Sequence, residues 1–208
     1  MHQLHITTNK RPIRYMQKPP SSLLRHHLSI FIFLAALPLM FAACHSDKPM
    51  QAKLDRIDSL INNNRIDEAY RLMRNDSVKY AQASHSLCMR YMLAYTDVKN
   101  RLFIPLTDDS MMVEVEKFYA SKGNPNEQTK ARYLLAACYR DMNIDLEAQK
   151  WATTAIENAD TTYQHFDYRI LYNAYILLGN SFHSATSTET TLDAYEQATY
   201  YALLKFRI

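Results

Sequence analysis

Apolar residues recur three and four positions apart through most of this chain, in short blocks separated by Asn, Asp and Pro. This spacing puts apolar side chains on one face of an α-helix, whereas a half-buried strand needs strict alternation. Only two glycines occur in 208 residues, and no alternating run is bounded by turn residues. The pattern predicts an all-α fold, with helices near 50–62, 66–74, 78–99, 109–122, 126–142, 145–159, 165–183 and 189–205.

Several helix ends carry residues that commonly begin or end helices. Asn124 followed by Pro125 predicts one helix start, and Asp109 precedes another. Gly123 lies just past a predicted helix end, where glycine readily adopts a left-handed backbone. The connections are short, so we expect neighbouring helices to form antiparallel hairpins.

Near the start of the chain, residues 28–43 form an apolar run without a charged side chain. Five basic residues and no acidic residue precede this run, which is the charge order of an export signal. The run has 16 residues and is interrupted by Pro38, whereas a helix that crosses a bilayer needs about 20. A cleaved signal is therefore favoured, with an uncleaved signal anchor as the alternative.

Ala42 and Ala43 stand directly before Cys44. These residues resemble the lipobox of bacterial lipoproteins, although Phe41 occupies the position where Leu is usual. The resemblance implies that the Cys44 thiol is lipidated and that Cys44 becomes the first residue of an outer-membrane lipoprotein.

The chain therefore divides into three predicted parts. Residues 1–43 are the lipoprotein signal peptide, with Met16 as a second possible start, 44–49 are a short tether, and 50–208 are one helical domain. The net charge of +3 changes to −2 once residues 1–43 are removed, because five bases and no acids precede Cys44. We therefore expect no nucleic-acid partner.

Cys88 and Cys138 are the two cysteines that follow Cys44. Both lie in apolar helical patterns, and neither belongs to a CxxC or metal-binding spacing. We expect buried free thiols, with a disulfide as the alternative.

Two segments in the second half share one pattern: a small residue, an aromatic residue three positions later, and an alanine 16 residues after the aromatic residue. These residues are Ala136, Tyr139 and Ala155 in the first segment, and Gly179, Phe182 and Ala198 in the second. The pattern resembles the tetratricopeptide repeat (TPR), in which small residues allow close helix packing. The resemblance implies antiparallel helical hairpins stacked as a right-handed solenoid, clearest over 126–160 and 169–203.

The match to the repeat is incomplete. Arg132 stands where the first aromatic residue is usual, and Thr191 replaces an alanine. Ala136 and Gly179 are 43 residues apart, longer than the usual period of about 34.

The resemblance also implies a binding surface, made by the first helix of each hairpin. The matching positions are Lys130, Tyr133, Ala137 and Arg140 in one hairpin, and Asn173, Ile176, Asn180 and His183 in the next. Each set is spaced three, four and three residues apart, so it lies along one helical face. Lys130 and Arg140 beside Tyr133 suit an acidic group or a carboxyl terminus of a protein or peptide partner. The alternative is that these are ordinary exposed polar residues.

Motifs for catalysis do not occur. After Cys44 the histidines are far apart in sequence, and neither a glycine-rich phosphate loop nor a GxSxG motif is present. We therefore expect no enzyme activity, no metal and no other cofactor.

A further short motif is Asp followed by Ser or Thr. With a small apolar residue or Thr in the third position, it places candidate O-glycosylation sites at Ser59, Ser77, Ser110 and Thr161. The motif resembles the glycosylation sequon of exported proteins in Gram-negative gut anaerobes, but helix caps at Asp76 and Asp109 explain two of the matches equally well.

Taken together, the chain resembles the TPR lipoproteins of those anaerobes. The resemblance implies a protein-binding scaffold that is lipid-anchored on the periplasmic or cell-surface face of the outer membrane. One alternative is glycan capture for an outer-membrane transporter. Another is a truncated remnant of a longer protein, because the sequence ends at YYALLKFRI without a polar capping helix.

Overall fold

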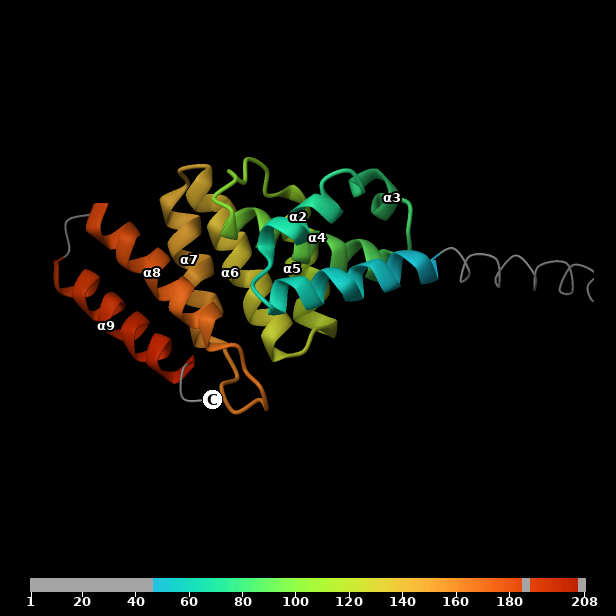
Figure 1. The fold of residues 1–208 in the computed structure, drawn as a ribbon. Helices are drawn as coiled ribbons and strands as arrows, with labels where there is room; N and C mark the ends of the chain where they lie inside the picture. Colours follow the sequence, from blue (N-terminus) through green and yellow to red (C-terminus); the bar gives the residue numbers. More distant parts are fainter. Residues whose placement is uncertain (1–46, 185–187, 206–208) are drawn as a thin grey trace, which may run out of the picture. The chain divides into compact units, whose positions relative to one another are not determined.

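The computed structural model describes residues 47–184 and 188–205, and within these ranges the chain is all-helical, without a strand (Figure 1). The predicted all-α class is therefore confirmed for this part of the chain. Its elements are a first helix over 47–62, α2 (Ile66–Met73), α3 (Ser77–Ala81), α4 (His85–Arg101), α5 (Ser110–Lys122), α6 (Pro125–Asp141), α7 (Asp145–Glu157), α8 (Tyr168–Ser184) and α9 (Thr188–Lys205).

The helix predicted over 78–99 is wrong, because the chain breaks it into α3 and α4. Ser84 precedes α4 with φ −56° and ψ 148°, outside the helical region. Tyr80 of α3 and Tyr91 of α4 stack with their ring centroids 4.2 Å apart. Both helices thus bury side chains in the same core, and the apolar pattern continues across the break and hides it.

Asn124 begins α6 as the sequence predicts. Its side chain accepts a hydrogen bond from the backbone N–H of Glu127 at 3.0 Å, and the Glu127 carboxylate accepts one from the backbone N–H of Asn124 at 2.9 Å. The caps expected at Asp76 and Asp109 are wrong, since neither side chain bonds the start of its helix. Asp76 is buried and pairs with Lys53 instead.

The left-handed backbone expected at Gly123 is also wrong, because Gly123 is extended, with φ −79° and ψ 152°. Left-handed residues instead follow the first helix, α4 and α6: Asn64, Phe103 and Asn143, with φ between 54° and 59°. In each case the N–H of the left-handed residue and the N–H of the next residue donate to carbonyls of the last turn, for example Ile104 N–H to the Lys99 carbonyl at 2.9 Å. These are Schellman motifs, in which glycine is usual.

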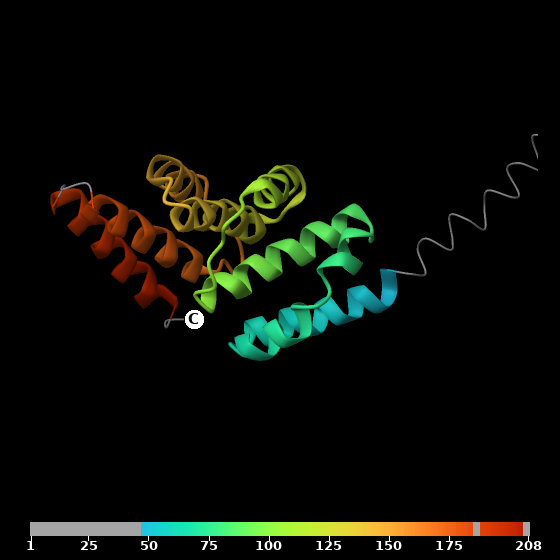
Figure 2. The same cartoon turned by 90° about the horizontal axis from the view of Figure 1, so that it is seen from above.

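From α4 to α9, each helix packs against the next one in the chain. The alternate helices α4, α6 and α8 also contact one another in that order, and α2 contacts α4. Figure 2, turned by 90° from Figure 1, shows α8 and α9 side by side again, so their pairing is not an effect of projection. One set of alternate helices, α4, α6 and α8, therefore forms a continuous row.

Two groups of buried apolar side chains hold the helices together. One joins the first helix, α2, α3 and α4, and the other joins α4 to α9. α4 contributes to both, with Tyr91 in the first and Leu93 in the second. α4 therefore links the two groups into one body.

The residues of the repeat pattern lie at the helix contacts. Ala136 and Ala155 are fully buried, and Tyr139 and Phe182 are partly buried against the second core. Gly179 lies against the ring of Tyr195 on α9. The prediction that small residues at Ala136 and Gly179 allow close packing agrees with these contacts.

Both described cysteines are free thiols, and the alternative of a disulfide is wrong. Cys138 is buried and Cys88 is half-buried. Burial, together with nearby Asp141 and Asp109, raises the pKa of Cys138 to about 12. The Cys138 thiol therefore stays protonated and unreactive at neutral pH.

Candidate functional site

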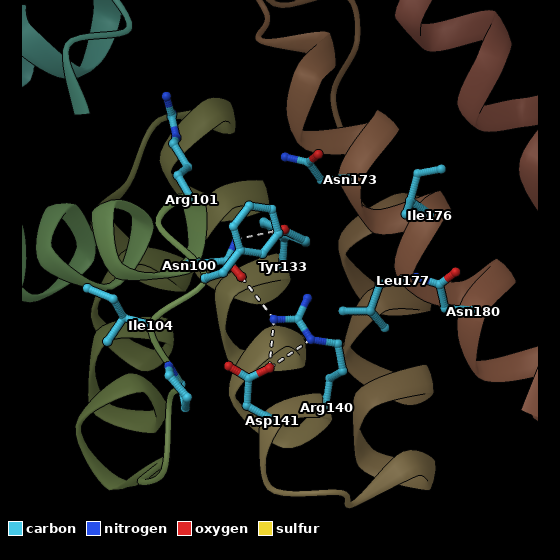
Figure 3. Close-up of a pocket in the computed structure, with 12 residues that line it drawn as sticks. Asn100, Arg101, Ile104, Tyr133, Arg140, Asp141, Asn173, Ile176, Leu177 and Asn180 are labelled. Carbon is cyan, nitrogen blue, oxygen red and sulfur yellow. Dashed lines mark hydrogen bonds and ion pairs between the residues drawn. The ribbon is translucent and has the colours of Figure 1, made fainter. Parts of the chain in front are cut away.

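A cavity of about 530 Å³, here called the large cavity, opens along the row of alternate helices. Its lining comes from the end of α4, the loop after α4, α6 and α8 (Figure 3). The lining residues are Asn100, Arg101, Phe103, Ile104, Pro105, Tyr133, Arg140, Asp141, Asn173, Ile176, Leu177 and Asn180.

A hydrogen-bonded network joins α4 to α6 along one wall of the large cavity. Arg140 donates to Asn100 Oδ1 at 3.0 Å and to Asp141 Oδ1 at 2.9 Å, and the Asn100 amide donates to the Tyr133 hydroxyl at 2.9 Å (Figure 3). Arg140 Nη1 makes no hydrogen bond within the residues that the structure describes. The network therefore fixes the Arg140 guanidinium and leaves one of its donors for a ligand.

Arg101 also lines the large cavity, but its guanidinium points toward Asp97 and away from Arg140 (Figure 3). Its Nε and Nη2 each donate to the buried Asp97 carboxylate at 2.8 Å. Arg101 Nη1 is buried and has no hydrogen-bond partner among the described residues. A buried donor without a partner is unfavourable, so this arginine is a cost to the fold.

Phe103 stands in the loop at the edge of the large cavity, and its side chain is 93% exposed. Its backbone is left-handed, with φ 54°, which is unfavourable for a bulky residue. The ring is therefore almost unburied, and the backbone beneath it has a conformation that glycine would adopt more readily. Its geometry suits a contact with a partner.

α8 forms the opposite wall with two amides and two aliphatic side chains. Asn180 Oδ1 accepts a hydrogen bond from the Tyr195 hydroxyl at 2.8 Å, which leaves its amide N–H groups for other contacts. Asn173 makes no side-chain hydrogen bond within the described ranges. Ile176 and Leu177 add apolar surface between the two amides. The large cavity therefore offers mainly donors, together with apolar surface.

The structure brings together four of the six residues predicted for partner binding. Tyr133, Arg140, Asn173 and Asn180 all line the large cavity. Lys130 does not line it: its Nζ lies 3.6 Å from Asp97 Oδ2, and Lys130 lines a separate cavity. The His183 side chain lies outside what the structure describes.

Tyr133 is more buried than a freely exposed binding residue would be, at 6% exposure. Burial raises the pKa of Tyr133, although the Asn100 hydrogen bond and Arg140 lower it in part. The hydroxyl therefore stays protonated, and its role in the lining is to hold Asn100 in place.

Sequence reasoning missed the contribution of α4 and its following loop to the site. Asn100, Arg101 and Phe103 carry no repeat pattern. One signal was present: a bulky aromatic residue directly after a helix end, at a position where glycine or asparagine is usual.

The predicted modification sites lie at scattered positions. Ser59, Ser77, Ser110 and Thr161 are all exposed, and Ser77 and Ser110 are the first residues of α3 and α5. Cys44, the candidate lipidation site, lies outside the described residues. None of the described helices is long and apolar enough to span a bilayer.

No group of three or more His, Cys, Asp or Glu side chains that suits a metal ion occurs among the described residues. No protein-family model, curated protein or solved structure matches this chain. The assignment of function therefore rests on the residues and geometry of the chain itself.

Proposed function

We propose that this protein is a lipid-anchored scaffold that binds a segment of a partner protein in the large cavity and carries out no catalysis. The fold proposed for it is a TPR-like right-handed solenoid. The observation that carries the proposal is the convergence of Tyr133, Arg140, Asn173 and Asn180, from α6 and α8, on one cavity. The same residues share one face in the repeat pattern.

The chemistry of the lining supports a peptide with an acidic group. Arg140 presents an Nη1 donor without a partner among the described residues. Asp141, the one acidic residue of the lining, already accepts from Arg140 and from the Leu106 backbone N–H at 3.0 Å. A carboxylate on the partner would accept a charge-assisted hydrogen bond from this Arg140 donor. Such a bond is stronger in a partly enclosed site than in open water.

The packing of the row supports the repeat architecture. α4, α6 and α8 contact one another in order, each beside the helix that follows it in the chain. Stacked hairpins of this kind bury a continuous core and leave one surface for a partner.

A photo-crosslinking amino acid at Ile176, which lies between the two amides of α8, tests the proposed binding. We expect it to capture a defined partner in native membranes, with yield falling about tenfold when Arg140→Ala removes a charged donor. A crosslinker at Lys117, which does not line the large cavity, is the matched control. Equal capture with and without Arg140 would overturn the proposal.

The lipid anchor has its own test. We propose that Cys44 carries acyl chains on the periplasmic or cell-surface face of the outer membrane, because two or more chains give stable anchoring. The intact mass of the protein from native membranes should show the diacylglyceryl group and the loss of residues 1–43. The same spectrum reports any glycan on Ser59, Ser77, Ser110 or Thr161.

Glycan capture is a second candidate, favoured by an exposed aromatic ring, Phe103, in the same cavity as the amides of Asn173 and Asn180. A polysaccharide pull-down separates the two proposals. Retention that depends on Phe103 without a protein partner favours the glycan.

A further inference from the structure

A second cavity, of about 210 Å³, lies between the first helix, α4, α5 and α6. It is called the small cavity here and shares no lining residue with the large cavity. Its apolar surface comes from Ile61, Leu93 and Ala94, which are each less than 9% exposed. The rest of the lining consists of Asn62, Tyr119 and charged side chains from three of the four helices.

Most of these charges are paired with one another. Arg90 Nε donates to Asp58 Oδ2 at 3.1 Å, and Lys130 Nζ lies 3.6 Å from Asp97 Oδ2. Arg90 is held further by Asp55 at 2.7 Å. Burial raises the pKa of Asp97, but Lys130 and Arg101 lower it more, so the Asp97 carboxylate stays ionised.

Three groups in the small cavity still have capacity for a ligand. Glu127 uses Oε2 to accept from the Asn124 N–H at 2.9 Å, and its Oε1 has no partner in the described chain. Asp58 Oδ1 is likewise without a hydrogen-bond partner there. Lys130 is too far from Asp97 for a hydrogen bond, so its N–H groups remain able to donate.

Tyr119, a residue that is almost fully buried, adds a hydroxyl without a hydrogen-bond partner in the part of the chain that the structure describes. It is 4% exposed and lines the small cavity, and its hydroxyl makes no hydrogen bond within residues 47–184 and 188–205. Burial raises the pKa of Tyr119, Glu127 and Asp58 raise it further, and Arg90 lowers it in part. Tyr119 lines the same cavity as these three charged groups, and its raised pKa keeps the hydroxyl protonated, so it remains a donor.

We propose that the small cavity binds a protonated α-amino group together with the carbonyl or carboxylate oxygen next to it. Free amino acids and peptide amino termini share this chemistry. The ammonium lies against Glu127 Oε1 and Asp58 Oδ1, and the oxygen accepts from Lys130 and the Tyr119 hydroxyl. The volume admits one small residue, which excludes a folded partner from the interior.

The charges of the lining select this ligand over simpler ones. A simple anion would meet the three carboxylates of Asp58, Asp97 and Glu127. A simple cation would leave the donors of Lys130 and Tyr119 without an acceptor. A ligand with both charges side by side satisfies both sets of groups.

Calorimetric titration of the purified protein with L-alanine, L-alanyl-L-alanine and N-acetyl-L-alanine tests the proposal. We expect saturable binding of one of the first two, with a Kd of about 1 mM. Tighter binding of alanine identifies the free amino acid as the source, and tighter binding of the dipeptide identifies a peptide terminus. N-acetyl-L-alanine should bind at least about tenfold more weakly, because it lacks the ammonium. Equal binding of the acetylated compound, or no saturable heat with any of the three, overturns the proposal.

Tyr119→Phe tests the assigned position of the ligand. The variant keeps the ring and removes a hydroxyl that has no partner in the described protein, so its thermal stability should stay within the range of the parent protein. Binding should weaken about fivefold to tenfold through the lost hydrogen bond. Tyr139→Phe, at a half-buried tyrosine that does not line the small cavity, should bind as the parent does. Unchanged binding in Tyr119→Phe overturns the proposal.

Discussion

The ring of Tyr195 on α9 lies directly over Gly179 on α8. A Cβ added to Gly179 would come within 2.6 Å of Tyr195 Cε1, closer than real Cβ contacts. Tyr195 is held there by its hydrogen bond to Asn180, the neighbour of Gly179 and a lining residue of the large cavity. The contact between α8 and α9 therefore helps to position one of the amides of the large cavity.

Gly179→Ala should destabilise the protein even though alanine favours helix more than glycine does. The helix preference is worth about 1 kcal/mol, and the overpacking against Tyr195 costs about 1–3 kcal/mol. In a Tyr195→Ala background the clash is absent, so the same change should become neutral or stabilising. Urea denaturation of the four proteins in this double-mutant cycle measures the difference. A Gly179→Ala cost that persists without Tyr195 would contradict the assigned contact.

The helix packing at Gly179 was predictable because it follows from a local pattern: a small residue and an aromatic residue on one helical face. The break between α3 and α4 was not predictable in this way. Tyr80 and Tyr91 both face the same core, so the apolar spacing does not change where the backbone turns. Periodicity reports which face is buried, and it does not report a short loop between two helices that share a core.

Asp97→Asn should lower the free energy of unfolding by about 3 kcal/mol, because Arg101 then keeps a buried charge without its carboxylate partner. The effect should depend on pH. Lys130 and Arg101 outweigh burial and hold the pKa of Asp97 below its ordinary value of 3.8. The stabilisation is therefore fully present above that value and is lost as the pH falls through the lower pKa of the folded state.

The measurement for Asp97 is the free energy of unfolding between neutral and acidic pH, compared for the parent protein and Asp97→Asn. The parent should lose more stability in acid, so the two curves should converge. Asp193→Asn, at an exposed position on α9, is the control and should follow the parent. If the free energies of unfolding of the parent and Asp97→Asn fall in parallel with pH, Asp97 does not cause the acid sensitivity.

Phe103→Gly should leave stability unchanged or raise it by up to about 1 kcal/mol. The left-handed backbone at φ 54° costs a side-chain-bearing residue about 1–2 kcal/mol, and the flexibility of glycine in the unfolded chain offsets about 0.5–1 kcal/mol of the gain. Partner capture by the crosslinker at Ile176 should fall at the same time, because the exposed ring is lost. Phe103→Ala should lose capture without the gain in stability. A clear loss of stability in Phe103→Gly would instead assign the ring to the fold.

Asn124→Ala should destabilise the protein by about 1 kcal/mol, since it removes the oxygen that accepts the Glu127 N–H at the start of α6. Asp109→Ala is the matched comparison at the start of α5. Its side chain makes no cap hydrogen bond, so its effect on thermal unfolding should be smaller. Equal losses in the two variants would mean that Asp109 stabilises the fold as much as the Asn124 cap does, at the start of α5 or through Tyr139.

The residues of α6 and α8 that line the large cavity were predictable as a group, because the spacing of three, four and three places them on one helical face. The position of Lys130 was not predictable from that spacing. Asp97 on α4 attracts Lys130 toward the small cavity, and no local pattern links residues 33 positions apart. Contacts between distant charged residues depend on how the helices pack, which a helical repeat pattern does not specify.

Arg132 stands where the TPR pattern has its first aromatic residue, and it forms an ion pair with Glu116. Its Nε lies 3.4 Å from Glu116 Oε1, both side chains are 13% exposed, and Arg132 Nη1 is buried without a partner among the described residues. Arg132→Met alone should destabilise the protein by about 3 kcal/mol, because Glu116 keeps an unpaired charge between α5 and α6.

The double variant Arg132→Met with Glu116→Met should recover that loss or exceed the parent in stability, since apolar side chains of similar volume avoid the desolvation of both charges. Urea denaturation of the parent, the two single variants and the double variant gives the coupling energy. A double variant no more stable than Arg132→Met would show that the pair contributes through contacts other than the ion pair. Recovery would explain how an arginine can replace an aromatic residue here: the charge is tolerated because α5 supplies its partner, and the helices still pack.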